Sequence, residues 1–125
     1  MPHLTAGNAR RFDLHGVAFH SFAASASGAT RLAAWRADVA PGTPGQAHTM
    51  TEEETLYVLA GTLTVEVGDE RFEANAGDAV LVPAGTRFRL SNTSESPAQL
   101  WVNTLLGMKA EMDSDGDLIA PPWAQ

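Results

Sequence analysis

The chain has 125 residues, enough for one domain with a single buried core. Its formal net charge of −7, without a cluster of Lys and Arg, excludes a nucleic-acid-binding face or a surface for anionic membranes. The lack of cysteine excludes disulfides and thiolate metal sites. Since we find neither a leader pattern nor a long apolar run, we expect a cytoplasmic protein with no membrane partner.

The first half of the chain predicts a series of short strands. Residues 17–24 and 32–39 have strand character and are separated by a small-residue segment. A Pro- and Gly-rich loop at 41–45 follows, and residues 48–54 and 56–59 predict two more strands that end at Gly61. Little in the chain sustains apolar residues at the helical period.

The second half alternates more clearly. Residues 62–67 place Leu63, Val65 and Val67 on one face of a strand, and a tight turn at 68–69 leads into a strand at 70–74. Further strands are predicted at 79–82, 87–91 and 98–106, with a polar loop at 92–97. Eight or nine short strands with frequent turns indicate one all-β domain, a sandwich or a barrel.

Both ends are less regular. Residues 1–11 and 107–125 are expected to be peripheral, the first along a sheet edge or in a dimer contact. The extended C-terminal segment carries Trp123, a large apolar side chain that we expect to close over the barrel or over a partner subunit.

Two segments carry spaced motifs. Residues 42–61 follow the pattern G-x(5)-H-x-H-x(3,4)-E-x(6)-G through Gly42, His48, Glu54 and Gly61, with Met50 in place of the second His. Residues 77–92 follow G-x(5)-P-x-G-x(2)-H-x(3)-N through Gly77, Pro83, Gly85 and Asn92, with Phe88 in place of His.

These motifs resemble those of the cupin superfamily, in its small single-domain, RmlC-like form. The resemblance implies an antiparallel β-barrel, also called a double-stranded β-helix or jelly roll, over residues 1–125. It also implies a homodimer, since pairing two barrels covers open sheet edges.

The resemblance implies a metal held by three His and one Glu, a set suited to divalent transition metals. Only His48 and Glu54 remain here, so the metal site is degenerate and incomplete, and we expect no cofactor. A divalent transition metal completed by recruited ligands stays open as an alternative. His15, His20, Gln99, Asn103 and Glu52 are the candidates for that role.

His48 and Glu54 are the predicted catalytic pair. A Glu in an apolar barrel has its pKa raised unless a His pairs with it, and such a pair suits acid/base chemistry. The predicted ligand pocket comprises Met50, Phe88, Trp101, Asn103 and His20.

The leading hypothesis is a cupin that binds a small apolar or aromatic compound. It would act on that compound without a metal, as a lyase, isomerase or cyclase. Two alternatives stay open, and with them whether the protein is an enzyme: a metal-dependent dioxygenase-type cupin, and a non-catalytic binding or sensing cupin.

Overall fold

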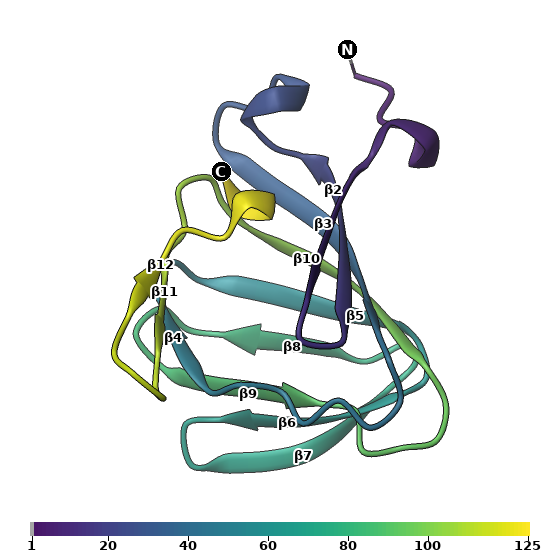
Figure 1. Cartoon of the computed structure of the whole chain (residues 1–125), viewed down its shortest axis with the longest axis vertical. Helices are drawn as coiled ribbons and strands as arrows, with labels where there is room; N and C mark the ends of the chain where they lie inside the picture. The colour runs from purple at the N-terminus through teal and green to yellow at the C-terminus, as the bar shows by residue number, and fades with distance from the viewer. Residues whose placement is uncertain (1) are drawn as a thin grey trace.

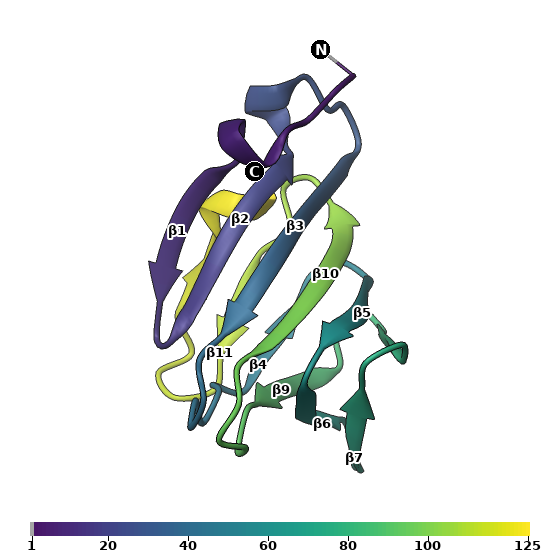
Figure 2. The same cartoon turned by 90° about the vertical axis from the view of Figure 1, so that its right-hand side faces the viewer.

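Two six-stranded antiparallel sheets face each other and form a jelly roll (Figures 1 and 2). The computed structural model describes residues 2–125. The first sheet has the order β1 (Arg10–Leu14), β2 (Val17–Ala23), β3 (Leu32–Val39), β10 (Ala98–Leu105), β5 (Glu54–Ala60) and β8 (Ala79–Val82). The second has the order β12 (Leu118–Ile119), β11 (Ala110–Met112), β4 (His48–Met50), β9 (Arg87–Ser91), β6 (Thr62–Val67) and β7 (Glu70–Asn75).

The expected all-β jelly-roll fold is confirmed, as two facing sheets that do not close into one continuous barrel. Three short 3-10 helices, η1 (Ala6–Asn8), η2 (Ser25–Ser27) and η3 (Pro122–Ala124), lie in the connections and near the C-terminus. No helix within residues 2–125 has the length and apolar character needed to cross a membrane.

Alternating side chains build the core between the sheets. Leu63 and Val65 of β6 are fully buried, as the period-two pattern predicts, because successive strand residues point to opposite faces. The strands predicted at 32–39, 62–67, 79–82 and 87–91 are confirmed with these bounds. Those at 17–24, 70–74 and 98–106 differ by one residue at an end.

The single strand predicted over residues 48–54 is wrong. β4 ends at Met50 in the second sheet, and Glu54 begins β5 in the first sheet. The polar residues 51–53 form a crossing between the two sheets, held where the Thr51 backbone N–H donates to the Lys109 carbonyl and the Thr51 hydroxyl accepts from the Lys109 N–H. Residues 48–50 and 54 therefore approach the interior from opposite sheets.

Two motif positions serve the fold. Gly61 has φ +81°, and a Cβ there would lie 2.7 Å from the Pro97 carbonyl oxygen, so only glycine fits the turn. Asn92 is completely buried, and its amide donates to the carbonyls of Val39 and Ser96 at 3.2 and 2.8 Å. These contacts fasten the loop after β9 to the first sheet.

The ends of the chain also form strands. β1 pairs with β2 through a hairpin whose tip, His15 and Gly16, has positive φ, and β1 lies at the sheet edge. β11 and β12 extend the second sheet beside β4 (Figure 1). We call residues 107–124 the roof segment, because several of their side chains line the space between the sheets.

Candidate functional site

A cavity of about 170 Å³ lies between the two sheets. Its walls are almost entirely apolar and come from both sheets and the roof segment. Prominent lining side chains are Trp35, Leu56, Met50, Phe88, Met108 and Trp123. The structure therefore places a small hydrophobic space where the motif residues converge.

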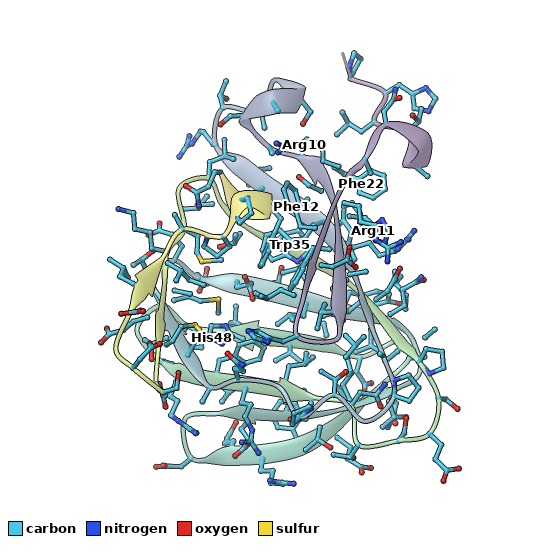
Figure 3. The ribbon with its side chains drawn as sticks, viewed as in Figure 1. Arg10, Arg11, Phe12, Phe22, Trp35 and His48 are labelled. Atoms are coloured by element: carbon cyan, nitrogen blue, oxygen red, sulfur yellow. The ribbon has the colours of Figure 1, made fainter. Side chains whose placement is uncertain are left out.

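All four motif positions that bind metal in metal-containing cupins line this cavity. His48 lines the cavity from β4 (Figure 3). Met50 lines it as well, whereas Thr49 between them points outward. Phe88 lies opposite His48 on β9, and the two rings meet edge to face with centroids 5.4 Å apart. Glu54 reaches the cavity from the start of β5. The structure thus brings together the four residues that the motif spacing had selected: His48, Met50, Glu54 and Phe88.

Glu54 is a buried acid without a partner. Its side chain is 4 % exposed, and Oε1 has no hydrogen-bond partner within residues 2–125. Burial in these apolar surroundings raises the pKa of Glu54 to about 8. The carboxyl group is therefore mostly protonated at neutral pH, and it has an oxygen free to hydrogen-bond a ligand.

His48 is held in one tautomer. Its Nδ1 lies 2.8 Å from the Gln46 carbonyl oxygen, which only accepts, so Nδ1 carries the proton and donates it. Burial lowers the pKa of His48, and the bond to Gln46 and the charge of Asp113 offset this only in part. The ring is therefore neutral at pH 7, with a lone pair on Nε2.

Three predicted pocket residues lie elsewhere. Trp101 and Asn103 are on the outer face of β10, where the indole Nε1 donates to Asn103 Oδ1 at 3.3 Å, while Leu100 and Val102 line the cavity. His20 likewise lies on the outer face of β2, because its neighbour Phe19 points inward. The expectation that His20, Trp101 and Asn103 line the cavity is not met.

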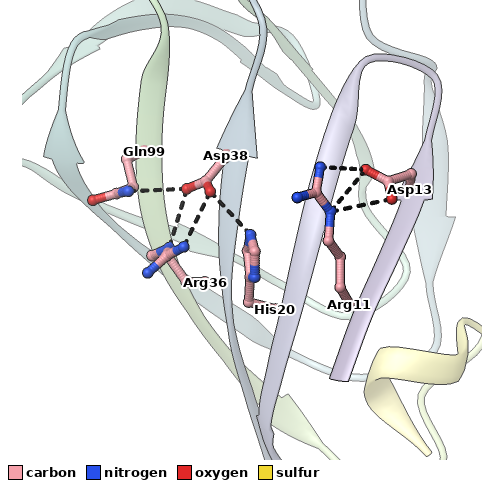
Figure 4. Close-up of polar contacts among 6 residues, drawn as sticks. All are labelled: Arg11, Asp13, His20, Arg36, Asp38 and Gln99. Atoms are coloured by element: carbon pink, nitrogen blue, oxygen red, sulfur yellow. Dashed lines mark hydrogen bonds and ion pairs between the residues drawn. The ribbon is translucent and has the colours of Figure 1, made fainter. Parts of the chain in front are cut away.

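His20 belongs to a polar network on that outer face (Figure 4). Its Nε2 lies 3.0 Å from Asp38 Oδ2, Arg36 donates to both Asp38 oxygens at 3.1 Å, and Gln99 donates to Oδ1 at 3.0 Å. Burial would raise the pKa of Asp38, but these hydrogen bonds hold it below its ordinary value. The network is satisfied within itself and fastens three strands together.

The roof segment contributes side chains that the sequence argument missed. Met108 and Met112 line the cavity, and the Trp123 ring stacks on Phe19 with centroids 3.6 Å apart and planes 5° apart. Closure by Trp123 over its own barrel was one of the two expectations for this tail, and the structure shows that arrangement. His15 at the β1–β2 hairpin tip, one of the candidates for a recruited metal ligand, also lines the cavity.

The side chains at the four motif positions do not form a metal site of the cupin type. Within residues 2–125, no three His, Asp or Glu side chains gather in an arrangement that holds a metal ion. Met50 offers only a soft thioether, and Phe88 offers no ligand atom. His48 and Glu54 alone do not fit a divalent transition metal.

Solved structures share this fold. The polyketide cyclase RemF from Streptomyces resistomycificus superposes with a TM-score of 0.75 at 17 % identity, covering 84 % of this chain and 79 % of the cyclase. An RmlC-like cupin from Shewanella frigidimarina NCIMB 400 gives a TM-score of 0.72 at 18 % identity, with 84 % and 91 % covered. At these identities the likeness shows the fold alone.

Sequence comparison points to the same family. A 1-hydroxy-2-naphthoate 1,2-dioxygenase from Nocardioides sp. (strain KP7) is 36 % identical over 61 residues, which is 49 % of this chain. The match spans only 16 % of the dioxygenase. Residues 35–104 match the cupin domain family Cupin_2, and this stretch is more than half of the chain. The chain therefore belongs to the cupin domain family.

Proposed function

We propose that this cupin binds a small apolar or aromatic organic compound in its interior cavity. It acts on the compound by metal-independent acid/base chemistry of the lyase, isomerase or cyclase type. The observation that carries the proposal is the Glu54 carboxyl group, buried in an apolar cavity with Oε1 unpartnered and with His48 lining the same cavity from the facing sheet. A buried polar atom without a partner costs stability, so its retention favours a role with a ligand.

The two side chains have complementary proton states at neutral pH. Glu54 is an acid that holds its proton, and His48 is a neutral base with Nε2 free. When their surroundings keep one titratable group protonated and the other unprotonated at the same pH, the first can act as general acid and the second as general base. No charge has to be buried before the reaction begins.

This pair suits proton transfer next to a carbonyl group. His48 Nε2 accepts a proton from the carbon beside the carbonyl as the Glu54 hydroxyl donates its proton to the carbonyl oxygen, which yields an enol, an imidazolium and a carboxylate. Return of a proton to another carbon gives an isomer, and attack of the enol carbon on a second carbonyl gives a ring. Reverse transfers restore both side chains.

The comparisons support the coarser part of the proposal. The neighbours include a protein named as a polyketide cyclase and a relative named as a dioxygenase, so small-molecule chemistry recurs among proteins similar to this one. A metal-dependent reaction of the dioxygenase type is less favoured, because the residues at the four ligand positions do not fit a divalent metal.

Proton exchange tests the proposal directly. Acetophenone carries exchangeable methyl protons beside a carbonyl, and NMR in D2O follows their replacement. We expect the protein to accelerate this exchange, and His48→Gln and Glu54→Gln each to reduce the acceleration by roughly 100-fold or more. His3→Gln and Glu53→Gln change the same residue types at exposed positions and are expected to leave the rate unchanged.

Three results would contradict the proposal. Exchange no faster than in buffer would favour a non-catalytic binding cupin. Full activity of Glu54→Gln would remove the acid from the mechanism. Loss of activity after metal depletion, with recovery on adding a divalent metal, would replace acid/base chemistry by the metal-dependent alternative.

A further inference from the structure

The cavity contains no fixed positive charge. Its lining residues include no Lys or Arg, and the ionisable side chains among them are His15, His48 and Glu54. A ligand carboxylate or phosphate inside the cavity would therefore find no lysine or arginine side chain in the lining to pair with, and its charge would be buried at a cost.

Charge outside the cavity acts in the same direction. The roof segment carries four acidic residues, Glu111, Asp113, Asp115 and Asp117, against one basic residue, Lys109. Arg87 already forms an ion pair with Asp113, with Nε 2.6 Å from Asp113 Oδ2. The whole chain has a formal net charge of −7 at pH 7. An anion approaching the roof segment is therefore repelled.

The size of the cavity limits the ligand to about one ring. Cavities of roughly 150 Å³ lined by Leu, Ile and Phe take up benzene, whereas drug-sized ligands occupy roughly 300 Å³ or more. The present cavity of about 170 Å³ falls beside the first value. Phe88 and Trp35 in its wall offer aromatic faces for such a ring.

One polar contact is left open. Glu54 Oε1 has no partner within the described part of the chain, and Nε2 of His48 has its lone pair unused. A single carbonyl or hydroxyl group on the ring would satisfy Glu54 without bringing a charge into the cavity.

From these features we infer that the site selects an uncharged single-ring aromatic compound with one carbonyl or hydroxyl group, and rejects the carboxylate of the same shape. This inference rests on the proposed function, because it names the class of compound that the same cavity takes.

A matched series tests the selection for charge. Acetophenone, benzamide and benzoate share the ring and the carbonyl and differ in carrying a methyl group, an amide nitrogen or a negatively charged oxygen. Calorimetric titration at pH 7 is expected to give similar affinities for the first two compounds. Benzoate should bind roughly 100-fold or more weakly, because its charge would be buried unpaired.

A variant at the cavity edge provides the converse test. Ile119 lines the cavity and is 36 % exposed, so a lysine there can reach the cavity while its backbone stays at the surface. Ile119→Lys should raise the affinity for benzoate at least 10-fold relative to that for acetophenone. Leu118→Lys, at an exposed neighbouring position outside the cavity lining, should leave both affinities unchanged.

The outcomes separate this inference from the proposed function. Benzoate binding as tightly as benzamide would overturn the inference and leave the acid/base proposal standing. Acetophenone that binds but does not exchange its methyl protons would overturn the proposed chemistry and support the inference. If none of the three compounds binds at millimolar concentration, both are overturned.

Discussion

Replacing Glu54 with Gln should change how the stability of the protein depends on pH. The pKa of this carboxyl is about 8 in the folded chain against an ordinary value of 4.5, so between these values only the folded state holds the proton. The folded state binds more protons than the unfolded state, and stability therefore falls as pH rises through this window. At about 1.4 kcal/mol per pKa unit, the total loss is about 5 kcal/mol, of which about 4 kcal/mol falls between pH 5 and pH 9.

Urea unfolding at a series of pH values measures this effect. A Gln side chain has no proton to lose, so the free energy of unfolding of Glu54→Gln should lack this loss. Relative to the unchanged protein, the free energy of unfolding of the variant should therefore rise by about 4 kcal/mol from pH 5 to pH 9. Glu53→Gln alters an exposed neighbour and should run parallel to the unchanged protein. A constant difference between Glu54→Gln and the unchanged protein across this range would refute the reasoning, since Glu54 would then be ionised in the fold.

Three further predictions concern the roof, the metal and the assembly. Trp123→Ala should lower the free energy of unfolding by about 3–5 kcal/mol in urea, because a buried stacked ring is lost, and Trp101→Ala on the outer face should cost less. The double variant M50H/F88H restores the two missing imidazoles and should hold zinc or iron near one per chain by elemental mass spectrometry, against far below one in the unchanged protein; equal metal contents would contradict this. The homodimer remains a prediction, and Leu81→Glu, at an outer-face position 56 % exposed, should yield monomers in sedimentation velocity, whereas an unchanged protein that is already monomeric would rule the dimer out.

Much of the fold could be predicted because most strands have one buried face. In β6 the alternation of Leu63 and Val65 with polar residues specifies the strand without knowledge of its partners. The break after Met50 could not be found in this way, because residues 48–54 read as one extended segment locally. Only pairing with β9 and β11 on one side, and with β8 and β10 on the other, divides it between two sheets. β1 and β11 carry mixed polar sequences and are likewise defined by their partners.

The site residues that belong to the two motifs could be predicted from the spacing of those motifs in the sequence. These motif positions are His48, Glu54, Met50 and Phe88, and all four line one cavity in the structure. Trp101 was misplaced because its neighbours in β10 are also apolar, so the sequence does not reveal which alternate residues face inward.

The missed roof residues have a similar explanation. Met108 and Met112 follow the last long strand, and no repeating pattern ties them to the motifs. Their position is set by the pairing of β11 with β4, which joins distant parts of the chain.

The strands that form the cavity walls pair over more residues than the strands of the roof segment, and this difference affects the rate at which a ligand exchanges. The wall strands β3 and β10 are joined through eight residue pairs, whereas β11 pairs with β4 through three and with β12 through two. Short ladders open locally at a much lower free energy than long ones. The time that a ligand spends inside would thus be governed by fraying of residues 107–124, and its affinity by the walls. Loosening the Trp123 stack would then shorten residence time more than it weakens equilibrium binding.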